Sequence, residues 1–366
     1  VGVPLAGYGF GPSVGILDDL EAQALVLASE SGTFAIVTAD LLAFGGDLVG
    51  RIRGRIEAEL DIPGEGVLLS ASHTHSGPAT APLRQWGIVN EDYARVLEAQ
   101  LLGLVAMAQR NQQEVRVGGG LGQVHNISEN RRAGKTIIDP AVPVLRVDDS
   151  SGRPLAVLHN FGCHPVSLHS YRNLISPDYP GYARQVIQGV LGREVVVMFT
   201  LGAAGDTNPA GYQAGKTTPV RSRQIGAILG CEVSRVALGI ETRSDAAFGF
   251  ARTTVELPVE PLPPAEELQA LHDRWAAEAE TRRAEGRPWA EISALAINEG
   301  SPARPTLVCS ASNGLLGYMP TSDAYEVNDY TNPSGLAPKV IDLYAFSRGA
   351  EPCVRRTATE LVRSLF

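Results

Sequence analysis

The alternation of short apolar or β-branched runs with longer helical patterns constrains this chain more than any other feature, and it continues to about residue 240. Runs of about four to eight such residues between turn signals predict buried strands, whereas apolar residues repeating every three or four positions predict helices. Because strands that alternate with helices form sheets covered by helical layers, we expect an α/β fold with a layered mixed β-sheet flanked by helices. Strands are expected at residues 33–38, 66–70, 144–147, 155–159 and 195–200, and helices at residues 48–60, 93–110, 180–191 and 222–238.

The chain beyond residue 240 carries further strand patterns and a charged segment. Residues 247–259 alternate polar and apolar side chains, which predicts a half-buried strand, and a proline-rich step then introduces a charged helix from residue 265 to about 285. A strand at 306–309 and a terminal helix near 355–365 complete the predicted elements. Because no internal repeat or long flexible linker interrupts the pattern, we expect one domain, 1–366, with a charged helical excursion at about 262–290.

Composition and charge exclude several classes of protein. The formal charge of -9, with 31 basic residues mixed among 40 acidic ones, argues against a nucleic-acid partner, which requires clustered Lys and Arg. No apolar run approaches the roughly 20 residues that cross a bilayer, so we expect a soluble protein without a transmembrane segment. The four cysteines lie far apart, which predicts neither a disulfide framework nor a cysteine zinc site.

The location and assembly of the protein are less constrained by the sequence. Because the sequence starts at Val1 without Met, we expect a start that has been trimmed or processed. We expect a cytoplasmic protein, while secretion stays open because a removed signal peptide fits the same start. No apolar heptad or patch indicates an oligomeric state.

A pair of histidines spaced by one residue is the sharpest local motif. His73 and His75 follow an apolar run within Leu68-Leu-Ser-Ala-Ser-His-Thr-His-Ser-Gly-Pro78. Because strand side chains alternate, both imidazoles are expected on one face, where they can reach one metal ion or one metal ion and its water. Loops beyond the carboxyl ends of strands are also where α/β proteins bind ligands. A hydrogen-bonded surface pair is the alternative reading of an isolated motif of this kind.

A second apolar run leads into His164 within Leu158-His-Asn-Phe-Gly-Cys-His-Pro165. This residue could supply a third nitrogen from a neighbouring strand end. His159 lies at the end of the run and His169 in the loop that follows, and for both we expect the role of a structural histidine with satisfied hydrogen bonds.

A glycine-rich turn follows the strand expected at 195–200, within Phe199-Thr-Leu-Gly-Ala-Ala-Gly-Asp-Thr-Asn-Pro209. Its small residues would let the backbone approach a ligand closely, with Asp206 and Asn208 at the rim. It matches neither a P-loop nor a Rossmann fingerprint, and a simple tight turn remains an alternative. Histidine donors at these strand ends favour Zn²⁺ over calcium or magnesium, which prefer oxygen ligands.

Several of these motifs resemble those of the neutral/alkaline non-lysosomal ceramidase family, and they occur in the family's order from about residue 3 to residue 330. The stretches that carry the resemblance are Ser72-His-Thr-His-Ser-Gly-Pro78, Asn130-Arg-Arg132, Asn160-Phe-Gly-Cys-His-Pro165, Ser176-Pro-Asp-Tyr-Pro-Gly181, Gly202-Ala-Ala-Gly-Asp-Thr-Asn-Pro209 and Asn313-Gly-Leu-Leu-Gly-Tyr-Met-Pro-Thr321.

The resemblance implies a ceramidase-like catalytic domain and a zinc-dependent hydrolase that cleaves the linear amide bond of an N-acyl compound with metal-activated water. Carried over to this chain, it makes His73 and His164 zinc ligands and Tyr318 the metal-associated tyrosine. His75 would contact the water or the oxyanion. Arg131 would aid binding or polarisation, and Tyr330 would hold the tetrahedral intermediate.

The chain departs from the family pattern at several points. Relatives complete the zinc shell with a glutamate of a Pro-Gly-Glu turn that is not visible here, which leaves Glu299, a deletion or an omitted segment as alternatives. Asn208 replaces a serine, so a serine nucleophile cannot act at that position. We expect the catalytic domain without the family's carboxy-terminal immunoglobulin-like domain. Because no aromatic membrane-facing stretch is evident either, we expect a soluble N-acyl substrate rather than a long-chain ceramide.

Two further functions remain open from the sequence. The same metal scaffold could hydrolyse an ester or a phosphoester. The chain could also be a non-catalytic ligand-binding homologue that lacks the acidic metal ligand.

Overall fold

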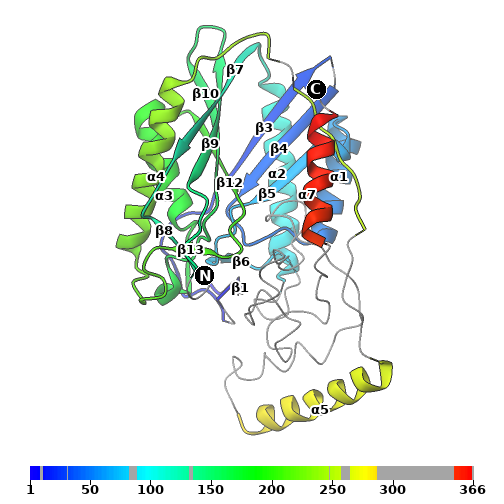
Figure 1. The fold of residues 1–366 in the computed structure, drawn as a ribbon. Coiled ribbons are helices and arrows are strands. Elements are labelled where there is room, and N and C mark those ends of the chain that lie inside the picture. Colours follow the sequence, from blue (N-terminus) through cyan, green and yellow to red (C-terminus); the bar gives the residue numbers. More distant parts are fainter. Residues whose placement is uncertain are drawn as a thin grey trace.

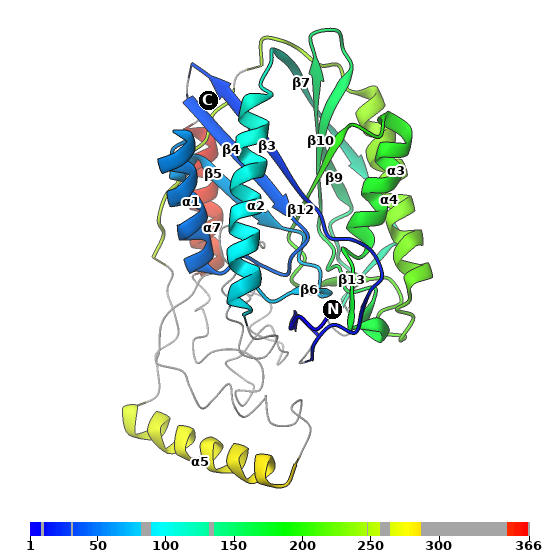
Figure 2. The same ribbon diagram turned by 180° about the vertical axis from the view of Figure 1, so that it is seen from behind.

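The computed structural model describes residues 1–8, 11–30, 32–81, 89–131, 135–246, 248–256, 264–286 and 350–364. These residues form an α/β structure in which two main sheets lie between helical layers, as Figures 1 and 2 show from opposite sides. The fold class predicted from the sequence is confirmed, with the strands divided between two main sheets and three small ones.

The smaller main sheet has the order β3-β4-β5, formed by Ala22–Ser29, Gly32–Ala39 and Val67–Ala71. Strands β3 and β4 are antiparallel, whereas β4 and β5 are parallel. Helices α1 (Gly46–Leu60) and α2 (Glu91–Arg110) share one hydrophobic core with this sheet. The apolar residues of α1 bury one stripe of the helix, which is why this segment folds as an amphipathic helix.

The larger main sheet has the order β12-β10-β9-β7, formed by Val196–Leu201, Pro154–Phe161, Ala141–Asp149 and Val115–Gln123. Only β10 and β12 pair in parallel. Helices α3 (Tyr179–Leu191) and α4 (Pro219–Gly239) pack on it. A Cβ atom at Gly120 of β7 would lie 2.8 Å from Val236 Cγ1, so the absence of a side chain there lets α4 approach the sheet closely.

The two α/β halves meet at strand β12, which contacts all three strands of the smaller sheet. A buried ion pair also joins them. Arg184 of α3 donates two hydrogen bonds, of 3.0 and 2.8 Å, to the carboxylate of Asp40, which directly follows β4. Arg184 also forms an ion pair of 3.2 Å with Glu21. The end of β4 and the middle of α3 are therefore held in a fixed relation.

Four short strands lie together just below the main sheets in Figure 1. They form two antiparallel pairs, β1 with β6 and β8 with β13, and a further short pair, β2 with β11, is parallel. These strands are β1 (Leu5–Ala6), β2 (Gly15–Ile16), β6 (Gly77–Pro78), β8 (Ser128–Asn130), β11 (Leu174–Ile175) and β13 (Thr207–Pro209).

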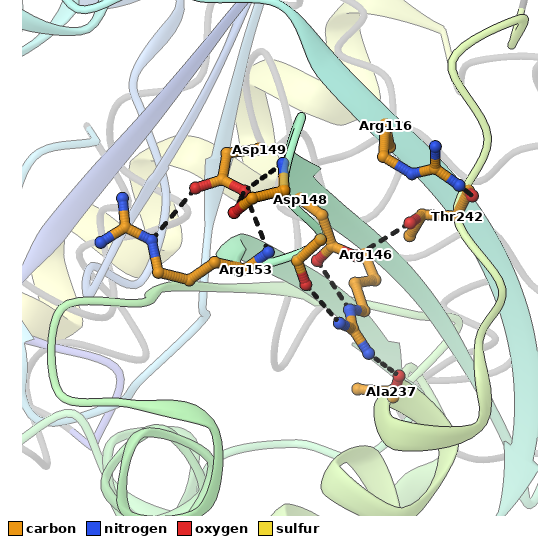
Figure 3. Close-up of polar contacts among 9 residues, drawn as sticks. Arg116, Arg146, Asp148, Asp149, Arg153, Ala237 and Thr242 are labelled. Carbon is orange, nitrogen blue, oxygen red and sulfur yellow. Dashed lines mark hydrogen bonds and ion pairs between the residues drawn. The ribbon is translucent and has the colours of Figure 1, made fainter.

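A polar network fixes the end of α4 to the sheet (Figure 3). Arg146 of β9 forms a 2.7 Å ion pair with Asp148 and donates a 2.9 Å hydrogen bond to the carbonyl of Ala237, near the end of α4. A cation at a helix carboxyl end is favourable because unpaired carbonyls there carry partial negative charge. Thr242 donates to Asp148 at 2.8 Å, and Arg116 of β7 donates to the Thr242 carbonyl at 2.6 Å.

The structure corrects one predicted strand. Residues 248–256 are not a strand, although their polar and apolar residues alternate. Phe248 and Phe250 instead pack their rings on Phe34 of β4, with centroid distances of 5.2 and 5.9 Å. The alternation thus reflects side-chain packing on a sheet rather than backbone pairing within one. Strands β3 and β7 were not predicted.

The helices of the last third are found where the sequence predicts them. The charged helix is α5 (Ala265–Ala284), and the terminal helix α7 (Ala350–Arg363) begins a few residues earlier than expected. The strand predicted at 306–309 lies outside the described residues. Among the helices that the structure describes, none is long and apolar enough to span a bilayer.

Candidate metal centre

Three buried histidines come together where the main parallel strands end. His73 and His75 follow β5, and His164 follows β10. Their ring centroids lie 4.9, 5.0 and 5.7 Å apart, and one ligand nitrogen from each lies within 4.8 Å of the others. Within the described ranges this is the one cluster of His, Cys, Asp or Glu side chains that could hold a metal ion. The structure thus joins the two histidine motifs.

The backbone around His73 aims its ring into the cluster. Strand β5 ends at Ala71, and His73 has a φ of 67°, in the left-handed region that residues with a side chain rarely adopt. Its N–H donates to the Leu41 carbonyl at 2.8 Å, and its Nδ1 lies 2.8 Å from the Leu42 carbonyl oxygen. The predicted reason for convergence, strand alternation, is therefore wrong. A turn held by the loop after β4 brings the two rings together.

His164 is held by the loop after β12. Its N–H donates to the Thr207 carbonyl at 3.0 Å, and its Nδ1 lies 2.6 Å from the Ala204 carbonyl oxygen. A Cβ atom at Gly202 would lie 3.0 Å from the Gly162 nitrogen. The absence of a side chain at Gly202 therefore lets two strand-end loops approach each other, and an approach of this turn to a ligand stays a prediction.

His75 is the most accessible of the three, at 9% exposed. Its N–H donates to the Pro165 carbonyl at 3.4 Å, and its ring hydrogen-bonds the backbone of Gly7. Its Nε2 is buried and has no hydrogen-bond partner among the residues that the structure describes. A buried nitrogen of this kind is available to a metal ion, a water molecule or a substrate.

Burial keeps the three imidazoles neutral. It lowers the pKa of His73 to about 4, although the hydrogen bond with Leu42 opposes this shift. Burial also lowers the pKa of His75 and His164 well below the usual value, and the charges of His73 and Arg131 lower each further. Neutral imidazole is the form that binds a metal ion, and a ring whose other nitrogen is hydrogen-bonded to a backbone carbonyl is the usual arrangement around zinc.

The charge of Arg131 lowers the pKa of all three histidines, which indicates that its side chain lies near the cluster. It directly follows β8, and its N–H donates to the Asp206 carbonyl at 2.8 Å. The side chain of Gln213 donates to the Arg131 carbonyl at 3.2 Å. Asp206 thus supports the turn that carries Arg131, and Asn208 is buried within β13 rather than placed at a rim.

The other predicted residues do not join the described cluster. Tyr318, Tyr330 and Glu299 lie outside the described residues, so their roles stay predictions. His169 is exposed and packs between the rings of Tyr8 and Tyr212, with centroid distances of 5.1 and 5.6 Å.

His159 contradicts the expectation of a satisfied structural histidine. It is 0% exposed, and neither ring nitrogen has a partner in the part of the chain that the structure describes. Its ring lies 5.3 Å from that of Phe199, so its surroundings are largely apolar. A position inside an apolar strand explains the burial, because β10 places this side chain toward α3 and its core.

Sequence reasoning missed the groups that orient the histidines. The backbone carbonyls of Leu42 and Ala204 leave no mark in the sequence, because every residue has a backbone carbonyl. Gly7 and Tyr8, which contact His75, are far from it in the chain and match no motif. Only a Gly-Tyr pair in the first residues could have suggested a close backbone approach.

Comparisons with known proteins agree with this picture. No protein-family model matches the chain. The chain is 28% identical over 138 residues to neutral ceramidase A of Dictyostelium discoideum, which covers 32% of the chain and 19% of that protein. It is 28% identical over 162 residues to the neutral ceramidase of Pseudomonas aeruginosa, which covers 39% of the chain and 24% of that protein. The matches thus span about a quarter or less of these relatives' length.

Solved structures give the same answer for the fold. The crystal structure of neutral ceramidase from Pseudomonas aeruginosa superposes with a TM-score of 0.58 at 23% identity, covering 64% of this chain and 42% of that one. A ceramidase complexed with C2 gives the same TM-score at 24% identity, covering 64% and 41%. In sequence and in fold, the chain is therefore neutral ceramidase-like.

Proposed function

We propose that this protein is a zinc-dependent hydrolase that cleaves the amide bond of a soluble N-acyl compound with activated water. The observation that carries the proposal is the cluster of His73, His75 and His164, whose ligand nitrogens lie within 4.8 Å of one another. The likeness of the chain to neutral ceramidases supports amide hydrolysis in particular. The same proposal treats residues 1–366 as one catalytic unit with α5 as an excursion from it.

The donor set fits zinc. In His73 and His164 Nδ1 contacts a backbone carbonyl, so the proposal assigns metal binding to Nε2 of each. Imidazole nitrogens suit Zn²⁺ better than Ca²⁺ or Mg²⁺. In this proposal His73 and His164 hold the ion, and Tyr318 and an acidic residue such as Glu299 complete its coordination.

A bound zinc ion would supply a Lewis acid and lower the pKa of water at the site. His75 contributes a neutral Nε2, which can accept a proton from the attacking water and return it to the leaving amine. Arg131 places a cation beside the cluster, where it stabilises the negative charge that develops on the carbonyl oxygen. Tyr330 would donate a further hydrogen bond to that oxygen.

Metal analysis and an activity screen test the proposal. The purified protein should contain one equivalent of zinc, and His73→Ala should lose both the zinc and the activity. His125→Ala, at an exposed position outside the cluster, is the matched control and should keep both.

The choice of substrates separates the competing functions. Matched amides, esters and phosphoesters with the same acyl or aryl group should show cleavage of the amide first. Preferential cleavage of an ester or phosphoester would contradict amide specificity. A metal-free protein that binds N-acyl compounds without cleaving them would show a binding homologue instead.

A further inference from the structure

The turn between His73 and His75 is closed by the side chain of Thr74. Thr74 is 0% exposed, and its Oγ1 accepts a hydrogen bond of 3.2 Å from the N–H of Ser76. A hydroxyl that bonds the backbone two residues further along the chain forms a compact local turn. The ring that this bond closes contains the backbone of His75. The Thr74 hydroxyl therefore restrains the direction in which the His75 side chain leaves the chain.

The same hydroxyl ties this turn to the loop before α3. Thr74 Oγ1 donates a 2.8 Å hydrogen bond to the carbonyl of Ser176, which lies 102 residues further along the chain. The Ser176 N–H in turn donates to the Ser76 carbonyl at 3.0 Å. All three residues are buried. A single hydroxyl thus acts as acceptor within the turn and as donor to a distant loop.

Ser176 is itself held in place by the start of α3. Its Oγ donates to Asp18 at 2.8 Å and accepts from the Asp178 N–H at 3.1 Å. The Asp18 carboxylate also accepts a 2.7 Å hydrogen bond from the Tyr182 hydroxyl. Asp178 caps α3, and Tyr182 lies in its first turn. The carbonyl that Thr74 contacts therefore has a fixed position relative to this helix.

The contacts of His73 do not depend on this hydroxyl. Its N–H donates to the Leu41 carbonyl and its Nδ1 lies 2.8 Å from the Leu42 carbonyl oxygen, so both contacts come from the loop after β4. The backbone of His75, in contrast, lies inside the turn that Thr74 closes. Loss of the Thr74 hydroxyl should therefore affect the direction of His75 more than that of His73.

We propose that Thr74 is a positioning residue for His75, because its hydroxyl fixes the turn that carries this imidazole to the loop before α3. In the proposed hydrolysis His75 moves a proton between water and the leaving amine, which requires its Nε2 within hydrogen-bond reach of the reacting groups. Gly7 contacts the ring itself, whereas Thr74 fixes the backbone from which the ring extends. This inference rests on the proposed function, because it assigns His75 a task in hydrolysis.

Two substitutions at Thr74 separate positioning from general stability. Thr74→Val removes the hydroxyl and keeps a branched side chain, whereas Thr74→Ser keeps the hydroxyl. Thr74→Val should bind zinc at the wild-type stoichiometry and lower kcat by about 10- to 100-fold with KM nearly unchanged, as expected when a catalytic group is slightly misplaced. Thr74→Ser should retain most of the wild-type kcat.

Thr38→Val is the matched control. Thr38 is 2% exposed, lies in β4 and donates a 2.9 Å hydrogen bond to the side chain of Gln23. Both valine variants should lower Tm, because each leaves a buried acceptor without its donor. Thr38→Val should nevertheless keep the wild-type kcat. An equal fall in kcat in the two valine variants would overturn the positioning role.

A second readout does not depend on activity or on bound zinc. In metal-free protein with ¹⁵N-labelled histidine, the ring signals of His75 are assigned with His75→Gln. Thr74→Val should shift or broaden these signals, and neither Thr74→Ser nor Thr38→Val should do so. Unchanged His75 signals in Thr74→Val would overturn the proposal, as would changed signals with an unchanged kcat in an active enzyme.

Ser176→Ala decides the question if Thr74→Val does not fold. It removes the hydroxyl that bonds Asp18 and Asp178 but keeps the carbonyl that Thr74 contacts, so the position of that carbonyl becomes less restricted. The His75 signals should then shift or broaden, and unchanged signals would overturn the proposal. Failure of wild-type protein to cleave any amide, with the His75 signals behaving as expected, would count against the proposed function and not against the role of Thr74 in holding His75.

Discussion

The buried imidazole of His159 should make the protein sensitive to acid, and His159→Leu should remove that sensitivity. Burial lowers the pKa of His159 to about 3, and the nearby charge of Arg184 acts in the same direction. Leucine has a similar size and removes two ring nitrogens that have no partners within the described residues. The substitution should therefore be neutral or stabilising at pH 7, because no hydrogen bond to those residues is lost.

The size of the effect follows from linkage. Because the folded pKa of about 3 lies below the unfolded value of about 6.5, the unfolded chain binds more protons between these values and folding stability falls as the pH drops. The cost is about 0.2 kcal/mol at pH 7, about 2 kcal/mol at pH 5 and about 3 kcal/mol at pH 4 for this one group. His159→Leu should gain that much stability over the wild type as the pH is lowered.

Urea unfolding of metal-free protein at pH 7, 6, 5 and 4 measures this difference. Subtracting wild type from variant at each pH cancels the contribution of the other buried histidines. His125→Leu, at an exposed position, is the control and should track the wild type at every pH. A stability difference between His159→Leu and wild type that stays constant from pH 7 to pH 4 would refute the reasoning.

Three further predictions follow from the packing and electrostatics. Asp40→Asn removes the buried charged partner of Arg184 and leaves it only the exposed carboxylate of Glu21, so the free energy of unfolding should fall by about 3 to 5 kcal/mol in urea titrations; a loss below about 1 kcal/mol would contradict a stabilising buried pair. Gly226→Ala places a Cβ 2.6 Å from the Tyr179 carbonyl oxygen, where α3 and α4 touch, so it should lower Tm and reduce the free energy of unfolding by about 1 to 3 kcal/mol. The control Gly103→Ala meets open space on α2 and should not lower Tm. Because burial lowers the pKa of His73 to about 4, this ligand should remain neutral at pH 5. Its contribution to zinc affinity, measured by chelator competition, should therefore be nearly constant from pH 7 to pH 5. A histidine with the usual pKa of about 6.5 would instead lower the zinc affinity by about 30-fold at pH 5.

Local patterns in the sequence are sufficient for the main helices and for the histidines of the cluster. The periodicities that predict α1, α2, α3 and α4 depend on residues a few positions apart, and each helix lies close to its expected place. The motifs around His73, His75 and His164 were likewise recognisable, because each histidine directly follows an apolar run that ends in a turn. The segment 248–256 shows the limit of the method, since alternation alone does not distinguish a strand from an extended stretch whose rings pack on one.

The tertiary structure decided how these pieces form a site. Parallel pairing of β4 with β5 and of β10 with β12 places the ends of these four strands together, and such pairing depends on contacts between residues distant in the chain. The left-handed φ of His73 and the carbonyls that hold the rings follow from those contacts, as do the buried position of His159 and the packing of Tyr8 on His75. The sequence by itself therefore indicated that the three histidines could bind a metal ion. The three-dimensional packing determined the direction, the neutral state and the neighbours of their rings, because these depend on burial and on backbone groups that no motif encodes.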